Sequence, residues 1–301
     1  MLRDGVVVHE FAAGIENGLF GTRAVPASRF RTASISKILT AVVVLQLVEE
    51  GRIELDRPLL EQVPIGAAIV DPRMYSITVR QLLSHTSGLP DAYPRFFAGG
   101  ASSWQQAAAL GLGDVLPGQP GTFFDYSNTN YCLLGLLIEH VDGRPYEDAV
   151  NARVLAPLGI VGPRLAGTFD VGFGEVVHQS GPGRNFMETL GPAGGWVASP
   201  AEVGQIVAAL DRPDGGLLSA DTVALMRRPH GAPFAEVEWS YGLGLRLFAN
   251  GSWGHTGTVE HTRAMAVNRP DGSTIVIMVS GEIPWSTDDL LVTIDAAVAA
   301  L

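Results

Sequence analysis

Apolar residues recur with helical spacing in two long segments of the chain. From Ser34 onward they fall on an i, i+3, i+4 pattern up to Val48, and Gly51 follows as a C-terminal cap. The segment from Tyr131 to Val141 repeats this pattern and ends at Gly143. We therefore expect two helices, with Ser34 at or near the N-terminus of the first.

Capping residues indicate further, shorter helices. Thr78 and Gln81 have the spacing of a capping box, and the helix that they open should end in the loop 85–90. Ser199, followed by proline and then by Glu202, has the same signature.

The C-terminal third changes to patterns typical of strands. A final helix from about Thr287 to Leu301 could cover the resulting sheet, and a strand from Val6 to Phe11 should form half of a hairpin at the start of the chain. The three strands expected near the C-terminus are Tyr241 to Phe248, Thr262 to Asn268 and Thr274 to Ser280, the last two joined by a turn at 269–272.

This order of elements predicts an α+β fold, in which an antiparallel sheet is covered by helices and a mostly helical lobe is inserted. The sequence has no internal repeat and no linker-like segment, so we expect one catalytic domain over residues 1–301. Its α/β lobe would comprise approximately residues 1–60 and 195–301, and its helical lobe approximately residues 61–194.

Composition and charge exclude several classes of protein. Apolar residues make up 47% of the chain and charged residues 17%, which excludes a disordered or fibrous protein. The net charge of −11 argues against nucleic acid or an anionic membrane as the main partner. No apolar run approaches the roughly 18 residues of a membrane span. The lone Cys132 cannot form an internal disulfide, and burial as a small hydrophobe is its simplest role.

The first residues lack the apolar region of a signal peptide. We therefore expect a cytoplasmic location for the sequence as given, and export if a leader or an N-terminal segment is missing. The oligomeric state stays open.

One residue stands out in the composition, because Lys37 is the only lysine among 20 basic residues. A desolvated amine can lose its proton near neutral pH, whereas a guanidinium cannot. A composition that disfavours lysine would explain the same count. Lys37 follows Ser34 by three positions, which places both side chains on one helical face, so the amine could accept the hydroxyl proton. Ser36 is expected to be an ordinary polar residue of the first turn.

Four motifs follow one another along the chain: Phe30 to Lys37 with its Ser-x-x-Lys, Gln81 to Pro90, Tyr126-Ser127-Asn128 and His255-Thr256-Gly257. In this order they resemble the motifs of the serine β-lactamase and penicillin-binding-protein superfamily. The resemblance covers about residues 5 to 300 and is strongest to the branch of class C β-lactamases, D-Ala-D-Ala carboxypeptidases, D-aminopeptidases and β-lactamase-fold esterases.

The resemblance implies a role for each matching residue. Ser34 would be the acylated nucleophile and Lys37 its base, while Tyr126 would relay protons to the leaving group and to the deacylating water. Asn128 would orient the substrate or Lys37.

The resemblance also implies an oxyanion hole made of two backbone N–H groups, those of Ser34 and Thr258. Gly257 would let its strand approach closely. The sequence departs from the family at His255, where β-lactamases and carboxypeptidases usually have lysine. A largely neutral histidine should bind a substrate carboxylate more weakly, which favours esters or uncharged amides.

Other residues with possible chemistry have simpler interpretations. Glu260 and His261 depart from a Gly-aromatic pair that the family often has, and we expect a solvated strand end there, with a pocket-lining role as the alternative. His85 should hold its loop by hydrogen bonds. The spacing of the histidines predicts no zinc site, and neither a metal nor a cofactor is implied.

The sequence thus predicts a serine hydrolase that acts on small-molecule esters or amides, with esters preferred and β-lactams last. A D-amino-acid-specific peptidase or carboxypeptidase and a β-lactamase are alternatives, as is a binding or sensing domain that does not turn over. An acyltransferase would use the same residues. An α/β-hydrolase is disfavoured because no Gly-x-Ser-x-Gly occurs.

Overall fold

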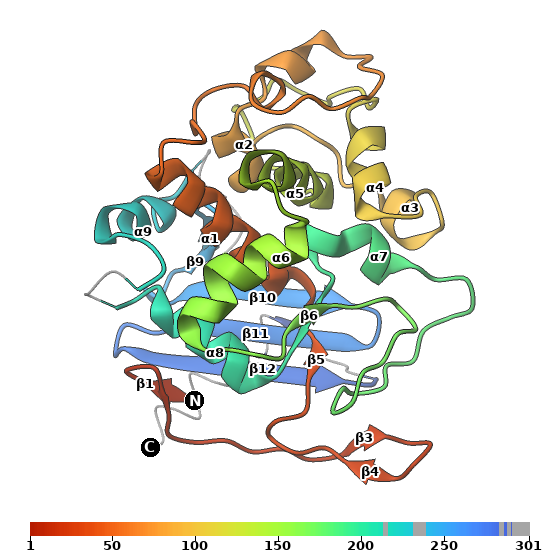
Figure 1. The fold of residues 1–301 in the computed structure, drawn as a ribbon, viewed down its shortest axis with the longest axis vertical. Coiled ribbons are helices and arrows are strands. Elements are labelled where there is room, and N and C mark those ends of the chain that lie inside the picture. The colour runs from red at the N-terminus through yellow and green to blue at the C-terminus, as the bar shows by residue number, and fades with distance from the viewer. Residues whose placement is uncertain (213–215, 231–238, 283–285, 288–289, 291–301) are drawn as a thin grey trace.

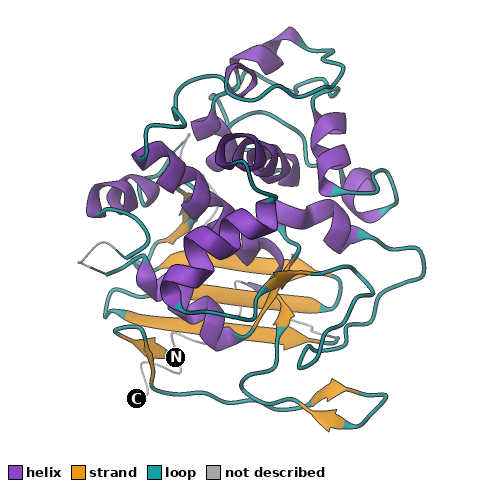
Figure 2. Ribbon diagram, viewed as in Figure 1, coloured by secondary structure: helices purple, strands orange, loops and turns teal. Residues whose placement is uncertain are grey.

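A seven-stranded antiparallel sheet lies beneath a layer of helices (Figures 1 and 2). The computed structural model describes residues 1–212, 216–230, 239–282, 286–287 and 290. The strand order is β2-β1-β12-β11-β10-β9-β8, so the two ends of the chain contribute neighbouring strands. The strands are β1 (Leu2–Arg3), β2 (Val6–Val7), β8 (Trp239–Tyr241), β9 (Arg246–Phe248), β10 (Trp253–Val259), β11 (Thr262–Asn268) and β12 (Ser273–Ser280). This arrangement confirms the expected α+β class. The division into two lobes stays a prediction.

The segment expected to form one strand from Tyr241 to Phe248 is two strands, β8 and β9. Between them the chain turns, with the Gly242 N–H donating to the Leu245 carbonyl at 2.8 Å and Gly244 at φ +81°. Leu243 and Leu245 alternate with Gly242 and Gly244 in this turn and are fully buried. The turn therefore has the alternating pattern that is typical of a strand.

The N-terminal hairpin is shorter than expected. Its turn at Asp4 and Gly5 has positive φ at both residues, as a tight hairpin requires. The outgoing strand ends at Val7 instead of Phe11, and β2 is the outermost strand of the sheet, so only β1 pairs with it. The final helix expected from Thr287 lies almost entirely outside the described residues.

Both long helices form where the apolar spacing predicts them. Helix α1 (Ser36–Glu49) follows a single 3₁₀ turn, η1 (Ala33–Ile35), so Ser34 lies just before the α-helix. Most of α1 is buried on all sides, as expected for a helix enclosed by a core. Helix α5 (Asn128–Asp142) ends at Gly143 with φ +80°.

Shorter helices surround these two. The expected capping boxes are present at the start of α2 and α8, where Thr78 and Ser199 each accept a hydrogen bond from the backbone N–H three residues later. The remaining α-helices are α2 (Val79–Leu83), α3 (Tyr93–Phe97), α4 (Trp104–Gly111), α6 (Tyr146–Val150), α7 (Phe186–Leu190), α8 (Pro200–Ala209) and α9 (Ala220–Met226), and a π-helical turn, η4 (Asn151–Leu155), continues α6. The 3₁₀ helices are η2 (Leu59–Glu61), η3 (Pro72–Ser76), η5 (Ala156–Leu158) and η6 (Gly191–Ala193).

Two small sheets contain strands from the N-terminal segment, and one of them joins this segment to the rest of the molecule. In one, β5 (Phe30–Arg31) and β6 (Arg164–Leu165) both pair with β7 (Trp196–Ala198). The other is the projecting hairpin of β3 (Ile15–Asn17) and β4 (Thr22–Arg23) (Figure 1). Because β5 leads directly into η1, its pairing with β7 fixes the position of the turn that carries Ser34.

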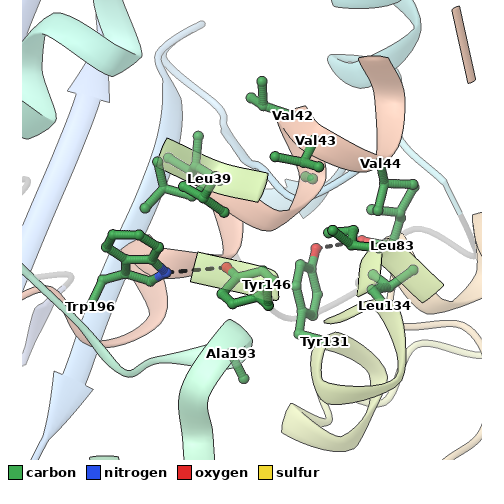
Figure 3. Packing of buried hydrophobic residues seen from close by; sticks show 14 of the residues in the cluster. Leu39, Val42, Val43, Val44, Leu83, Tyr131, Leu134, Tyr146, Ala193 and Trp196 are labelled. Carbon is green, nitrogen blue, oxygen red and sulfur yellow. Dashed lines mark hydrogen bonds between the residues drawn. The ribbon is translucent and has the colours of Figure 1, made fainter. Parts of the chain in front are cut away.

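The core around α1 contains aromatic side chains whose polar atoms all have partners (Figure 3). The Trp196 indole N–H donates to the Tyr146 hydroxyl at 3.2 Å, and the Tyr131 hydroxyl donates to the Leu83 carbonyl at 2.9 Å. Trp196 is fully buried, so it belongs to this core. Cys132 is fully buried as well, as its sequence context suggested.

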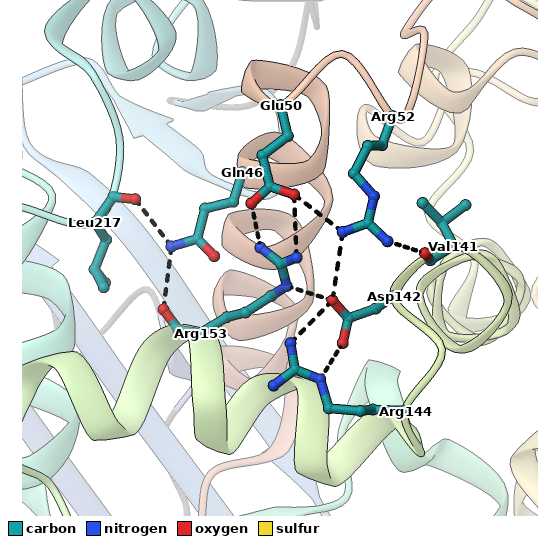
Figure 4. Close-up of polar contacts among 8 residues, drawn as sticks. All are labelled: Gln46, Glu50, Arg52, Val141, Asp142, Arg144, Arg153 and Leu217. Atoms are coloured by element: carbon teal, nitrogen blue, oxygen red, sulfur yellow. Dashed lines mark hydrogen bonds and ion pairs between the residues drawn. The ribbon is translucent and has the colours of Figure 1, made fainter.

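An ion-pair network ties the C-terminal ends of α1 and α5 to η4 (Figure 4). Arg153 Nε and Arg144 Nε each donate to the Asp142 carboxylate at 2.6 Å, and Arg153 also pairs with Glu50. The Asp142 side chain is only 1% exposed. This network holds together α1 and α5, whose N-terminal ends carry Lys37 and Asn128, and ties both to η4.

Candidate active site

Ser34 and Lys37 face one another at the start of α1. The Lys37 Nζ atom lies 3.2 Å from Ser34 Oγ, which is hydrogen-bonding distance. Three residues of separation across the junction of η1 and α1 bring the two groups onto one face, as their spacing predicts.

Two other oxygens surround the Lys37 amine. Nζ donates to Asn128 Oδ1 and to the Ala193 carbonyl, each at 2.8 Å. Both oxygens can only accept, so a neutral amine must point its two N–H groups at them. Its lone pair then faces Ser34 Oγ.

Burial favours this neutral form. The Lys37 side chain is fully buried, and desolvation lowers its pKa to about 7; the Asp91 carboxylate opposes this shift, and the Arg246 guanidinium adds to it. A large fraction of the amine is therefore unprotonated at neutral pH.

Asp91 holds the Asn128 side chain in the required orientation. The Asp91 Oδ1 atom accepts hydrogen bonds from the backbone N–H and the Nδ2 amide of Asn128, both at 3.2 Å. These bonds identify the Asn128 nitrogen and direct its oxygen toward Lys37. The sequence analysis missed Asp91, since a carboxylate in the loop before α3 has no distinguishing pattern.

Tyr126 completes the group around Ser34. Burial raises the pKa of its phenol above the usual value, and the nearby Ser34 side chain partly offsets this shift. Lys37 Nζ lies 4.8 Å from the centre of the Tyr126 ring. The structure therefore brings together the three residues that the sequence analysis assigned to catalysis.

Strand β10 approaches the turn that carries Ser34 at Gly257. A Cβ atom at this position would lie 2.5 Å from the Thr32 carbonyl oxygen, 3.0 Å from Ala33 Cβ and 3.3 Å from Ser34 N. Only glycine permits this approach. Thr258, the next residue, is exposed beside the same turn. Ala33 has φ +48°, a conformation that is costly for a residue with a side chain and that often occurs at functional sites.

His255 lies on the same strand but both of its ring nitrogens are engaged. Its Nδ1 donates to the Thr256 carbonyl at 2.5 Å, so Nε2 is the acceptor and receives the Tyr241 hydroxyl at 2.9 Å. Burial lowers the pKa of His255 well below its usual value, and the ring is neutral. The structure thus places a neutral, internally bonded histidine where a cation is usual in related enzymes.

A cleft of about 600 Å³ adjoins Thr258. Tyr93 and Phe97 of α3 form one wall, and Glu260 and His261 of the turn between β10 and β11 form another. Glu260 pairs with Arg184 at 2.8 Å and its side chain is 20% exposed. The expectation of a solvated strand end therefore does not hold for Glu260, which is half-buried and paired, whereas His261 is exposed as expected; both residues line the cleft.

Within the described part of the chain, no three His, Cys, Asp or Glu side chains converge in a way that could hold a metal ion. The same residues include no helix long and apolar enough to cross a bilayer.

Comparisons with known proteins show which family and fold this chain resembles. A family model described as "Beta-lactamase" matches residues 1–299. Penicillin-binding protein 4 of Amycolatopsis lactamdurans is 31% identical over 156 residues, which is 51% of this chain and 40% of that protein. The chain spans about half the length of the curated relatives it matches.

Solved structures show the same fold. A D-stereospecific amidohydrolase from Streptomyces sp. is 28% identical, with a TM-score of 0.70 over 84% of this chain and 82% of that one. A penicillin-binding protein from Bacillus halodurans has a TM-score of 0.79 over 95% of this chain and 91% of that one, at 22% identity.

Proposed function

The chain belongs to the β-lactamase family, and on this basis we propose that it is a serine hydrolase that cleaves small esters or amides through an acyl-enzyme on Ser34. The observation that carries the proposal is the Lys37 amine, which is buried, has two fixed acceptors for its N–H groups and lies 3.2 Å from Ser34 Oγ.

Acylation begins with proton transfer from Ser34 Oγ to Lys37 Nζ as Oγ attacks the substrate carbonyl carbon. The carbonyl π electrons move onto oxygen and a tetrahedral intermediate forms. When this intermediate collapses, the bond to the leaving group breaks, and the leaving group takes a proton through Tyr126, which Lys37 resupplies.

The negative charge of the intermediate needs hydrogen-bond donors. The backbone N–H groups of Ser34 and Thr258 are assigned to this role, and the close approach at Gly257 supports the assignment because it brings the two backbones together. Deacylation reverses these roles. Water gives a proton through Tyr126 to Lys37 and attacks the ester on Ser34, so the acid is released and Ser34 Oγ regains its proton.

The neutral state of His255 supports a preference for substrates without a carboxylate at this position. Both ring nitrogens bind within the protein, so the ring offers no cation to a substrate anion. We therefore place esters first and β-lactams last. Hydrolysis of D-amino acid amides is a second candidate, supported by the 28% identity to the D-stereospecific amidohydrolase.

A side-by-side assay of the purified protein tests this proposal. A p-nitrophenyl ester, a D-amino acid amide and a chromogenic cephalosporin are compared at equal concentration, with Ser34→Ala as the control. We expect turnover of the ester to be fastest and Ser34→Ala to be inactive. A cephalosporin hydrolysed faster than every ester would contradict the preference, and an active Ser34→Ala variant would contradict the mechanism. Stable labelling by a fluorophosphonate without turnover of any substrate would instead indicate a binding or sensing domain.

A further inference from the structure

His85 has an unusual place directly behind the Tyr126 ring. It follows helix α2, is fully buried and has φ +57°, a conformation that few residues with a side chain adopt. Such backbone strain persists where the surroundings impose it, often beside a functional group.

The His85 ring stacks on Tyr126. The ring centres are 4.2 Å apart with an angle of 29° between the planes. The edge of the Tyr241 ring contacts His85 from another side, at 4.9 Å and 70°. The Tyr126 ring thus contacts both His85 and Lys37, whose Nζ lies 4.8 Å from the ring centre.

Hydrogen bonds to His85 also fix the backbone next to Tyr126. His85 Nδ1 accepts the backbone N–H of Ser127 at 3.1 Å and lies 3.0 Å from Asn130 Nδ2. A nitrogen that accepts from an amide N–H cannot carry a proton, so the proton of the neutral ring is on Nε2. Among the described residues Nε2 has no hydrogen-bond partner. The ring therefore has no route for passing a proton to Tyr126 or Ser34.

We propose that His85 is a positioning residue for Tyr126, which holds the phenol against Ser34 by stacking on its ring and by anchoring the following peptide through Nδ1. The inference rests on the proposed function, since it assigns to Tyr126 the transfer of a proton to the leaving group.

This role predicts a dependence on the leaving group. An amide or an alkyl ester needs a proton from Tyr126 as its bond breaks, whereas p-nitrophenolate leaves without one. A misplaced phenol should therefore slow acylation by the first kind of substrate much more than acylation by the second. Because Tyr126 also serves deacylation, the two kinds of substrate are compared by kcat/KM, which reports acylation. A general loss of folded protein would slow both equally.

His85→Asn is the informative variant. Asparagine tolerates positive φ and keeps an acceptor for the Ser127 N–H, but it removes the ring that stacks on Tyr126. We expect kcat for an amide or alkyl ester to fall about 10- to 100-fold, the range of one general acid's contribution, with KM within about twofold. For the p-nitrophenyl ester we expect kcat/KM, which reports acylation alone, to fall less than about threefold.

A double-mutant cycle shows whether His85 acts through Tyr126. In a Tyr126→Phe background, His85→Asn should cause no further loss on the amide or alkyl ester. If the two losses multiply, or if His85→Asn slows both kinds of substrate equally, the positioning role is wrong.

Two further measurements keep the test decisive. If His85→Asn does not fold, Asn130→Ala serves instead, because it removes one of the two donors to His85 Nδ1. We then expect the same dependence on the leaving group, with a smaller effect. Equal losses on both substrates would again contradict the proposal.

Labelling of wild-type Ser34 by a fluorophosphonate separates the role of His85 from the proposed function. An unlabelled Ser34 overturns the proposed function, whereas a labelled Ser34 with no leaving-group effect overturns only the role of His85.

Discussion

Burial of Lys37 penalises its charged form, and this is what suits the residue to the role of base that we propose. An ammonium loses its hydration in the core, and here three oxygens replace it, one of which is the Ser34 hydroxyl to be deprotonated. All the other Lys and Arg positions are arginine, which suits bidentate ion pairs such as those around Asp142.

The pH dependence of kcat/KM should report the Lys37 amine. Because the neutral form is the active one and its pKa is about 7, kcat/KM for a p-nitrophenyl ester should rise with pH and be half-maximal near pH 7. Asp91→Asn removes the negative charge that raises the pKa of Lys37, so the midpoint should move to lower pH. Asp4→Asn, in the hairpin turn, is the matched control and should leave it unchanged. If Asp91→Asn left the midpoint of the pH profile unchanged, the profile would not report the Lys37 amine.

At the scale of elements, the site depends on how closely β10 approaches η1. Gly257→Ala should lower kcat/KM about 100-fold or more, the cost of losing one oxyanion-hole donor, because a methyl group would push the strand away from Ser34 N. Gly66→Ala is a suitable control, since nothing lies within 4 Å of a Cβ there. Initial rates with one ester compare the two variants with wild type. A Gly257→Ala variant as active as Gly66→Ala would contradict the oxyanion assignment.

The ion-pair network makes a separate prediction about stability. Asp142→Asn leaves Arg144 and Arg153 without their buried carboxylate and should lower the free energy of unfolding by about 3 kcal/mol. Glu61→Gln breaks an exposed pair with Arg57 and should cost less than about 1 kcal/mol. Denaturant unfolding measures both. If both substitutions lowered the free energy of unfolding equally, burial of the Asp142 carboxylate would add nothing to the strength of its ion pairs.

Periodicity and motifs predicted the elements that bury a regular face, and they failed where a turn resembles a strand. The apolar spacing located α1 and α5, and the capping boxes located α2 and α8. The turn between β8 and β9 was predicted as part of one strand, because its alternating leucines are buried as the leucines of a strand would be. Asp91 and the stacking of His85 on Tyr126 could not be predicted, since both arise from contacts between segments distant in sequence.

At the scale of the whole molecule, the enclosed amine should make stability depend on pH. The pKa of Lys37 is about 7 in the folded protein against 10.5 for the ordinary amine. Between these values the unfolded chain binds one more proton than the folded protein, so this group's contribution to stability rises with pH, and its penalty is complete below about pH 7.

Comparison with Lys37→Met isolates that contribution. The difference in unfolding free energy between wild type and Lys37→Met should change by about 1.4 kcal/mol per pH unit between pH 7.5 and 9.5, in favour of wild type at higher pH. Denaturant unfolding at several pH values measures it. If the difference in unfolding free energy did not change with pH, the Lys37 amine would not be desolvated, contrary to its burial in the structure.

The central claim is that a neutral Lys37 deprotonates Ser34, and the most direct test is intact-mass measurement of acyl-enzyme formation with a p-nitrophenyl ester in wild type and Lys37→Arg. The substitution keeps the positive charge and removes the ability to lose a proton at neutral pH. We expect one acyl group on Ser34 of the wild-type protein and none on Lys37→Arg over the same time. Acylation of Lys37→Arg at the wild-type rate, or an acyl group on a residue other than Ser34, would contradict the account.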